Sequence, residues 1–207
     1  MKGSREYQIK RIDTIKEEWR RDVPKAEVNC FPWARAENDF CPLTNVYAAY
    51  NDTSIFVFME TAETELRALA RGFGFVHTDS CMEFFLSPDP SSPHYINWEF
   101  NPAGAMYLSI GTERNNRTKL PQENYREFFQ LRTAVFDKGW NLEYCIPFSF
   151  LQRFFPLLEI KTGCVMRGNF YKCGDETAHP HYGCWSPIHL SEPDFHCPDF
   201  FGTFVFC

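Results

Sequence analysis

Polar side chains recur along one side of the segment Tyr95 to Asn101. Side chains of a β-strand alternate between its two faces, so Asn97 and Glu99 share a face with Tyr95, and the apolar residues between them point the other way. Asparagine is uncommon in strands, and departures from local preference are typical of functional positions. An amide beside a carboxylate offers both donors and acceptors, which is the chemistry that reads hydroxyl groups.

Two other segments carry the same pattern. Glu83 lies within Asp79 to Leu86, and three further polar side chains lie within Met166 to Lys172. If the three segments are neighbouring strands, one surface holds Glu83, Asn97, Glu99, Arg167, Asn169 and Tyr171. Such a surface suits a sugar, but an antiparallel sheet also has a polar face for solubility alone, and both interpretations stay open.

The elements that must position these side chains are mostly strands, because period-2 alternation runs through nearly the whole chain. The expected strands are 44–50, 54–60, 79–86, 95–101, 105–110, 131–137, 140–147, 166–172 and 202–207, with turn residues between them. Short helices are expected near Tyr125 to Gln130 and after Pro147, and Asp13 to Arg21 is helical or extended. We predict an all-β fold, an antiparallel, jelly-roll-like β-sandwich with one or two short helices, forming a single domain over residues 1–207.

The segment Gly174 to Pro198 interrupts this pattern. It is rich in Pro, His and Asp and shows no periodicity. We predict a long, ordered loop there, and such loops on a rigid sheet often carry function.

Composition narrows the classes of partner. The net charge is −6 and no basic run is present, so nucleic acid is an unlikely ligand by charge. No stretch approaches the length of a membrane span, and the charged N-terminus lacks the apolar segment of a signal peptide. These features predict a protein without membrane association, monomeric and cytoplasmic, or exported if a leader had been removed.

Nine cysteines are present, several inside apolar strand-like runs, so buried free thiols in a reducing compartment are expected. Cysteines and histidines crowd the segment after residue 173, but their spacing is not that of a zinc site. We therefore predict no metal and no cofactor. Structural calcium at acidic loops stays an alternative.

An ordered set of motifs resembles the family 9-like carbohydrate-binding domains. The set runs through most of the chain as DSCMEFF, NWEFN, NFYKCGD, CWSPI and PDFHCPDFFGTFVF. The resemblance implies a β-sandwich that binds saccharides without cleaving them. It also implies two aromatic rings that hold a sugar between them, with polar side chains reading its hydroxyls.

Carried onto this sequence, the resemblance makes Trp185 one stacking ring, with a core tryptophan as the alternative. Glu83 matches a hydroxyl-reading acid, and Asn97 and Glu99 lie in the strand that supplies further polar contacts. The sequence departs from the family at the other ring, because His77 stands where the family has tryptophan.

We predict non-catalytic carbohydrate binding by aromatic stacking and hydroxyl readout, with carbohydrate catabolism as one setting for it. His77 and Trp185 are the expected walls, and the expected hydroxyl readers are Glu83, Asn97, Glu99, Asn169, Tyr171 and, less strongly, Arg167. One alternative is a glycoside hydrolase or other sugar-active enzyme that uses Glu83 and Glu99. Another is a protein-interaction domain with a degenerate sugar site.

Overall fold

The computed structural model describes residues 5–13, 18–35 and 39–207, and within them it contains strands and only short helical turns. The strands are β1 (Glu6–Arg11), β2 (Ala26–Val28), β3 (Thr44–Tyr50), β4 (Ser54–Thr61), β5 (Cys81–Ser87), β6 (Tyr95–Phe100), β7 (Met106–Glu113), β8 (Asn116–Lys119), β9 (Arg132–Phe136), β10 (Gly139–Pro147), β11 (Val165–Gly174), β12 (His181–Cys184) and β13 (Gly202–Phe206). The helices are α1 (Tyr125–Phe128) and α2 (Phe148–Gln152), with 3-10 turns η1 (Trp19–Asp22), η2 (Val76–Thr78) and η3 (Pro198–Phe200). No helix in the described ranges is long and apolar enough to cross a membrane.

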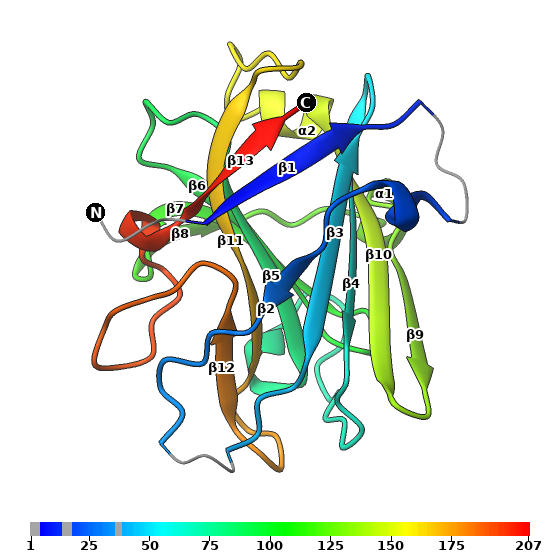
Figure 1. The fold of residues 1–207 in the computed structure, drawn as a ribbon, viewed down its shortest axis with the longest axis vertical. Helices are drawn as coiled ribbons and strands as arrows, with labels where there is room; N and C mark the ends of the chain where they lie inside the picture. Colours follow the sequence, from blue (N-terminus) through cyan, green and yellow to red (C-terminus); the bar gives the residue numbers. More distant parts are fainter. Residues whose placement is uncertain (1–4, 14–17, 36–38) are drawn as a thin grey trace.

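The strands form one sheet that curls into two facing halves (Figure 1). The first half has the order β8-β7-β6-β5-β11-β13, with β12 beside β11, and the second has the order β3-β4-β10-β9, with β2 beside β3. β1 joins them, because Glu6–Ile9 pair with β13 and Lys10–Arg11 pair with β3. The predicted β-sandwich is confirmed. Its sheet is mixed rather than purely antiparallel, because both pairings of β1 are parallel.

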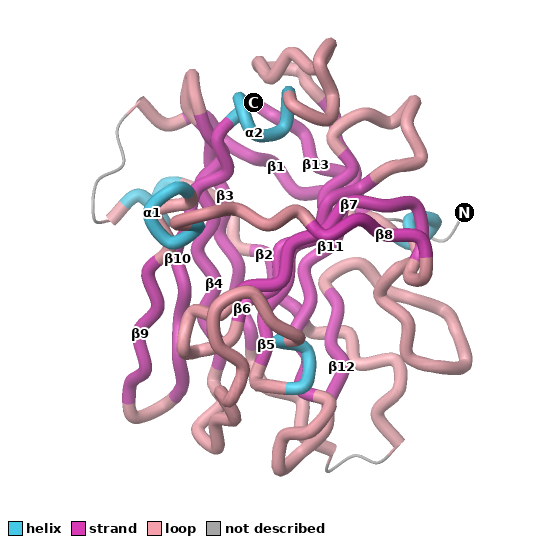
Figure 2. The backbone as a smooth tube through the Cα atoms, turned by 180° about the vertical axis from the view of Figure 1, so that it is seen from behind, coloured by secondary structure: helices cyan, strands magenta, loops and turns pink. Residues whose placement is uncertain are grey.

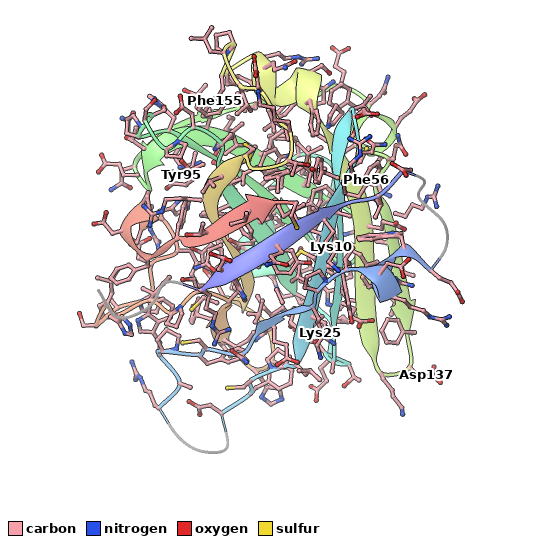
Figure 3. The ribbon with its side chains drawn as sticks, turned by 45° about the horizontal axis from the view of Figure 1, so that its top comes forward. Lys10, Lys25, Phe56, Tyr95, Asp137 and Phe155 are labelled. Carbon is pink, nitrogen blue, oxygen red and sulfur yellow. The ribbon has the colours of Figure 1, made fainter. Side chains whose placement is uncertain are left out.

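The main core lies between the two halves. The inward side chains of β6, which are Ile96, Trp98 and Phe100, pack there with residues of β4 and β10 such as Val57 and Leu142. This is the apolar face that alternation predicts for Tyr95 to Asn101. Burial of large apolar side chains on both layers is the main stabilising contribution to such a sandwich. Figure 3 shows side chains filling the space between the layers of strands, with Asp137 at the tip of the β9–β10 hairpin.

All nine predicted strands are present, with ends shifted by a few residues. Four strands were not predicted, namely β1, β2, β8 and β12. They are short or polar, and each depends on a neighbouring strand rather than on its own composition. Of the segment Asp13 to Arg21, residues 14–17 lie outside the described residues, and Trp19 begins the 3-10 turn η1.

The outer face of the first half-sheet is covered rather than exposed to solvent. A second apolar cluster forms on it, in which Phe85 and Tyr171 from the sheet pack with Phe195 and Phe201 from the segment after β12. The turn η2 also packs on this face, against β5, β6 and β11 (Figure 2). The polar face predicted from the sequence therefore lies beneath loops.

Candidate functional site

Neighbouring strands bring the predicted polar residues onto one face. In the order β7-β6-β5-β11, Glu99 is paired with Tyr107, Glu83 with Glu99, and Tyr171 with Glu83. Directly opposed residues point to the same side of a sheet. The three polar segments are therefore neighbouring strands, and their polar side chains share one face of the sheet.

A cavity of about 340 Å³ opens above the middle of this row. Glu99 on β6, Glu83 on β5 and Cys173 on β11 form its floor. Tyr107 on β7 and Tyr182 on β12 lie toward opposite ends of the row of strands. A concave site with acids in the middle and aromatic rings at both ends has the chemistry of a binding pocket for a small polar ligand.

The aromatic side chains form two groups. On one side Phe75 stacks on Tyr107, with ring centroids 5.9 Å apart and an angle of 23° between the planes, and His77 packs edge-on against Phe75. On the other side Phe195 stacks on Tyr171 at 4.1 Å and 7°, and Tyr182 packs near it. Each group is fixed by ring-to-ring packing before any ligand arrives.

A buried carboxylate fixes the segment that carries Phe75 and His77. Asp79 is fully buried, and it accepts hydrogen bonds from Asn101 Nδ2 at 2.8 Å and from the Ala70 N–H at 2.9 Å. Arg67 donates to Asp79 and also to Glu176, each at 2.5 Å. One arginine thereby ties η2 to the loop that follows β11.

Burial raises the pKa values of the acids that line the cavity. Burial raises the pKa of Glu99 to about 7, although Asn97 and Arg117 act against this. Burial also raises the pKa of Glu83 well above its usual value, and the neighbouring Cys173 and Glu99 add to the effect. The pKa of Asp175 on the rim is raised by burial as well. With a pKa of about 7, Glu99 occurs in both its protonated and its ionised form near neutral pH, and the protonated form both donates and accepts hydrogen bonds.

Arg117 leaves one donor unused at this site. Its Nη2 donates to Asn97 Oδ1 at 2.5 Å and its Nε to Ser109 Oγ at 2.7 Å, while its guanidinium lies over the Tyr95 ring. Its Nη1 is buried and has no hydrogen-bond partner in the described part of the protein. Arg117 also lines the cavity.

The comparisons with known proteins identify the family. Residues 16–206 match the carbohydrate-binding family 9. The chain belongs to this family. A search of the curated proteins returned no match.

Solved structures agree with the family. A proposed carbohydrate-binding protein from Bacteroides uniformis ATCC 8492 is 28% identical over 99% of this chain and 100% of its own, with a TM-score of 0.81. A family 9 module from Caldicellulosiruptor kristjanssonii in complex with cellotriose is 12% identical, covering 98% of this chain and 93% of its own, with a TM-score of 0.66. A family 9 module from the same organism in complex with glucose is also 12% identical, covering 98% of this chain and 96% of its own, with a TM-score of 0.69.

Within this family 9 fold, the predicted hydroxyl readers separate into two groups. Glu83 and Glu99 line the cavity, as does the predicted wall residue His77. Asn97 supports them from within the sheet, because its Nδ2 donates to Glu99 Oε1 at 2.7 Å. The structure thus brings these four predicted residues together.

Three other predicted readers are engaged elsewhere. Asn169 is buried and exchanges hydrogen bonds with the backbone of Ser186. Tyr171 is buried beneath Phe195 and donates to its carbonyl at 3.0 Å. Arg167 donates to the Phe201 carbonyl. The first two hold the covering loop in place, and none of the three lines the cavity.

Trp185 does not form a wall of the cavity. Its side chain is 4% exposed and stacks on Phe204 at 5.3 Å and 15°, inside the main core. The ring reaches this position because Gly202 has no side chain, and a Cβ there would lie 2.3 Å from it. A core indole cannot stack on a ligand, so the alternative interpretation as a core tryptophan describes this residue.

The lining residues that sequence reasoning missed come mostly from two irregular segments. Phe75 precedes η2, and Asp175, Tyr182, Phe195 and His196 lie in the segment predicted as a functional loop. The sequence composition indicated a functional loop over this segment, but it did not indicate which of its residues line the cavity. Tyr107, in contrast, lies on a predicted strand and could have been found by extending the row from Glu99.

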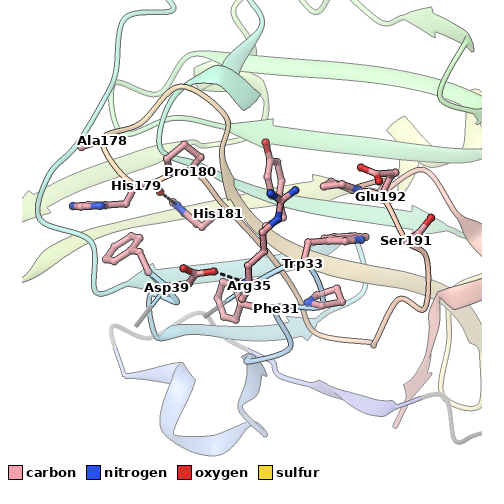
Figure 4. A pocket seen from close by; sticks show the side chains of 15 residues that line it. Phe31, Trp33, Arg35, Asp39, Ala178, His179, Pro180, His181, Ser191 and Glu192 are labelled. Atoms are coloured by element: carbon pink, nitrogen blue, oxygen red, sulfur yellow. Dashed lines mark hydrogen bonds between the residues drawn. The ribbon is translucent and has the colours of Figure 1, made fainter. Parts of the chain in front are cut away.

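A second cavity of about 640 Å³ adjoins the first, and the two share Tyr182 and Pro193. Figure 4 shows Trp33 and Glu192 toward one side of it, His179 and His181 toward the other, and Arg35 extending into the space between. Trp33 packs edge-on against Tyr182, and its Nε1 donates to the Leu190 carbonyl at 3.0 Å. Aromatic side chains therefore continue from one cavity into the next.

Proposed function

We propose that the cavity above Glu83 and Glu99 binds a saccharide and does not cleave it. One observation carries this proposal: two buried acids, Glu83 and Glu99, lie side by side on neighbouring strands, and aromatic side chains line the cavity on both sides of them. Carboxyl groups in such a position can hydrogen-bond to sugar hydroxyls. Family membership supports the same function.

Each part of the cavity has a role in this proposal. The apolar face of a sugar ring stacks on Phe75 and Tyr107, which are already packed together. Glu83 and Glu99 offer acceptor oxygens to adjacent hydroxyls, and Glu99 is also a donor in its protonated form. Arg117 lines the same cavity and supplies a cationic donor for a ring or hydroxyl oxygen.

Family membership favours binding over hydrolysis. A retaining glycosidase needs one ionised carboxylate as nucleophile beside one protonated acid. Here burial raises the pKa of both Glu83 and Glu99, to about 7 for Glu99, and turnover measurements distinguish binding from hydrolysis. The enzyme alternative predicts turnover of aryl glycosides that disappears in Glu99→Gln, whereas our proposal predicts no turnover in any variant.

The substitution of the family tryptophan by His77 does not leave the wall without aromatic surface. Phe75 and Tyr107 are stacked beside His77 and line the same cavity. This arrangement favours a working site over the degenerate site that the sequence also allowed.

The adjoining cavity suggests that the ligand is longer than one sugar. Trp33 and Tyr182 continue the aromatic surface beyond the carboxylates, and the second cavity holds charged side chains that can bind hydroxyls. We infer that an oligosaccharide places one unit above Glu83 and Glu99 and extends past Tyr182 toward Trp33.

Isothermal titration with a panel that includes glucose and cellotriose tests the proposal. Phe75 is 60% exposed, so Phe75→Ala should fold normally and weaken binding about fivefold or more through the lost stacking surface. Phe136→Ala is the matched control, because Phe136 is a partly exposed aromatic on β9, which belongs to the other half-sheet. The proposal fails if no saccharide binds the wild type, or if both variants bind as the wild type does.

A further inference from the structure

Three buried side chains with metal-binding atoms converge beneath the cavity. Cys81 on β5 and Cys173 on β11 are directly paired in register, and Glu83 lies two residues along β5 on the same face. Glu83 Oε1 is 3.0 Å from Cys173 Sγ and 3.8 Å from Cys81 Sγ. All three ligand atoms lie within 4.8 Å of one another, and no other such group of three or more occurs in the residues that the structure describes.

These distances match the spacing that a small tetrahedral cation imposes on its ligands. Zinc binds thiolate sulfur at about 2.3 Å and carboxylate oxygen at about 2.0–2.2 Å. Tetrahedral angles then place two sulfurs about 3.8 Å apart and a sulfur about 3.5 Å from an oxygen. The existing triangle needs only small side-chain adjustments to meet these values.

Charge balance points the same way. Elsewhere in the protein a buried carboxylate has a cation, since Glu63 pairs with Lys172 at 2.9 Å. Glu83 is equally buried, yet among the described residues its carboxylate contacts two thiols and no lysine or arginine. Buried carboxylates are normally paired with a cation or bound to a metal.

We propose that Cys81, Glu83 and Cys173 bind a thiophilic divalent cation such as zinc. Two strands supply the three ligands, and the fourth position faces the cavity that Glu83 and Cys173 line. Three protein ligands with one open position form the kind of zinc site that accepts water or a ligand oxygen. A motif search for closely spaced ligands misses this group because Cys81 and Cys173 meet only through strand pairing.

Cobalt is the probe for this site, since its thiolate complexes absorb light through sulfur-to-metal charge transfer. The reduced, chelator-treated full chain is titrated with Co²⁺ and then with Zn²⁺. The expected result is one equivalent of Co²⁺ with a charge-transfer band that Zn²⁺ abolishes. Cys81→Ser and Cys173→Ser should each weaken binding about a hundredfold and reduce the band. Glu83→Gln should weaken binding but keep the band, because both thiolates remain.

Cys184→Ser is the matched control. Cys184 is also buried and directly paired, with Cys30, but no carboxylate joins that pair among the described residues. This variant should bind cobalt as the wild type does. The proposal is overturned if the wild type shows no band, if the band is unchanged in Cys81→Ser and Cys173→Ser, or if it is lost in Cys184→Ser.

Two further measurements separate the outcomes. Peptide mapping of the isolated, metal-free protein, alkylated without reductant, shows whether Cys81 and Cys173 form a disulfide. Such a disulfide would overturn the proposal. Should a serine variant fail to fold by circular dichroism, Glu83→Gln and zinc-dependent thermal stabilisation of the wild type still test the site. Saccharide titrations are read independently, so either proposal can fail alone.

Discussion

At the residue scale, a few buried acidic and basic side chains have the largest effect on the stability of this protein and on its pH dependence. Glu83 and Glu99 lie on the outer face of the first half-sheet, and Glu63 and Lys172 form a separate, fully buried pair. Each is held in a low-polarity environment, where the energy of a charge depends on its immediate partner. Changes of one functional group should therefore have measurable effects.

Glu99→Gln should change how stability depends on pH. The folded pKa of Glu99 is about 7 and the usual value is 4.5, so between these values only the unfolded chain loses the proton. The wild type is therefore progressively disfavoured as pH rises from 4.5 to 7, and Gln removes that effect. Relative to the wild type, the variant should gain roughly 2–3 kcal/mol over this window in urea unfolding. A difference that is constant with pH would contradict the assignment.

Glu63→Gln should destabilise the protein by about 3–5 kcal/mol, because it leaves the Lys172 ammonium buried with its charge uncompensated. Lys172 Nζ also donates to His181 Nε2 at 2.7 Å, but this histidine is neutral at pH 7, because burial and then Lys172 lower its pKa to about 4, and a neutral acceptor does not compensate the ammonium charge. Chemical denaturation measures the loss. Asp52→Asn is the control, since it breaks the exposed Arg11–Asp52 pair and should leave the midpoint nearly unchanged.

At the scale of elements, regular strands form the floor of the site and irregular segments form its walls. The strands β5, β6 and β11 could be predicted because period-2 alternation is a local property, and so could the shared face of Glu83 and Glu99. The position of Phe195 could not, because it follows from packing on Tyr171 across the sheet. Trp185 shows the same limit, since the space left by Gly202 decides that it points into the core.

The aromatic surface between the two cavities leads to a prediction about ligand length. Trp33→Ala should weaken binding of cellotriose about fivefold or more and leave glucose binding unchanged, because only the longer ligand reaches the second cavity. Phe75→Ala should weaken both ligands alike, as it removes surface beside the carboxylates. Isothermal titration of the four combinations distinguishes the patterns. Equal weakening of both sugars by Trp33→Ala would show that Trp33 acts on the first cavity instead.

At the scale of the whole molecule, β1 is shared by the two halves of the sheet. Alternation along β1 places Tyr7 and Ile9 in the main core, where both are buried. The segment was nonetheless missed in the sequence, because its other residues are charged or polar and its pairing partners lie far along the chain. The general sandwich could be predicted from composition, but the parallel strand that joins its halves could not.

Ile9→Ala should destabilise both halves together, by about 2–5 kcal/mol, since it removes a fully buried side chain at the junction. Trp98 reports on the first half and Trp140 on the second, so fluorescence and far-ultraviolet circular dichroism should follow one common unfolding transition. Two separated transitions in the variant would show that the halves are stable independently.

The pairing of β1 with β13 also affects how the protein folds during its synthesis. β1 is synthesised before its partner β13, so that edge of β1 stays unpaired until β2 to β12 have been made. Contacts that join such distant parts of a chain form slowly, and an unpaired strand edge can pair with the wrong partner meanwhile. Apart from Tyr7 and Ile9, the side chains of β1 are charged or polar. This composition made the strand difficult to recognise in the sequence, but it also keeps the unpaired strand hydrated until β13 has been synthesised.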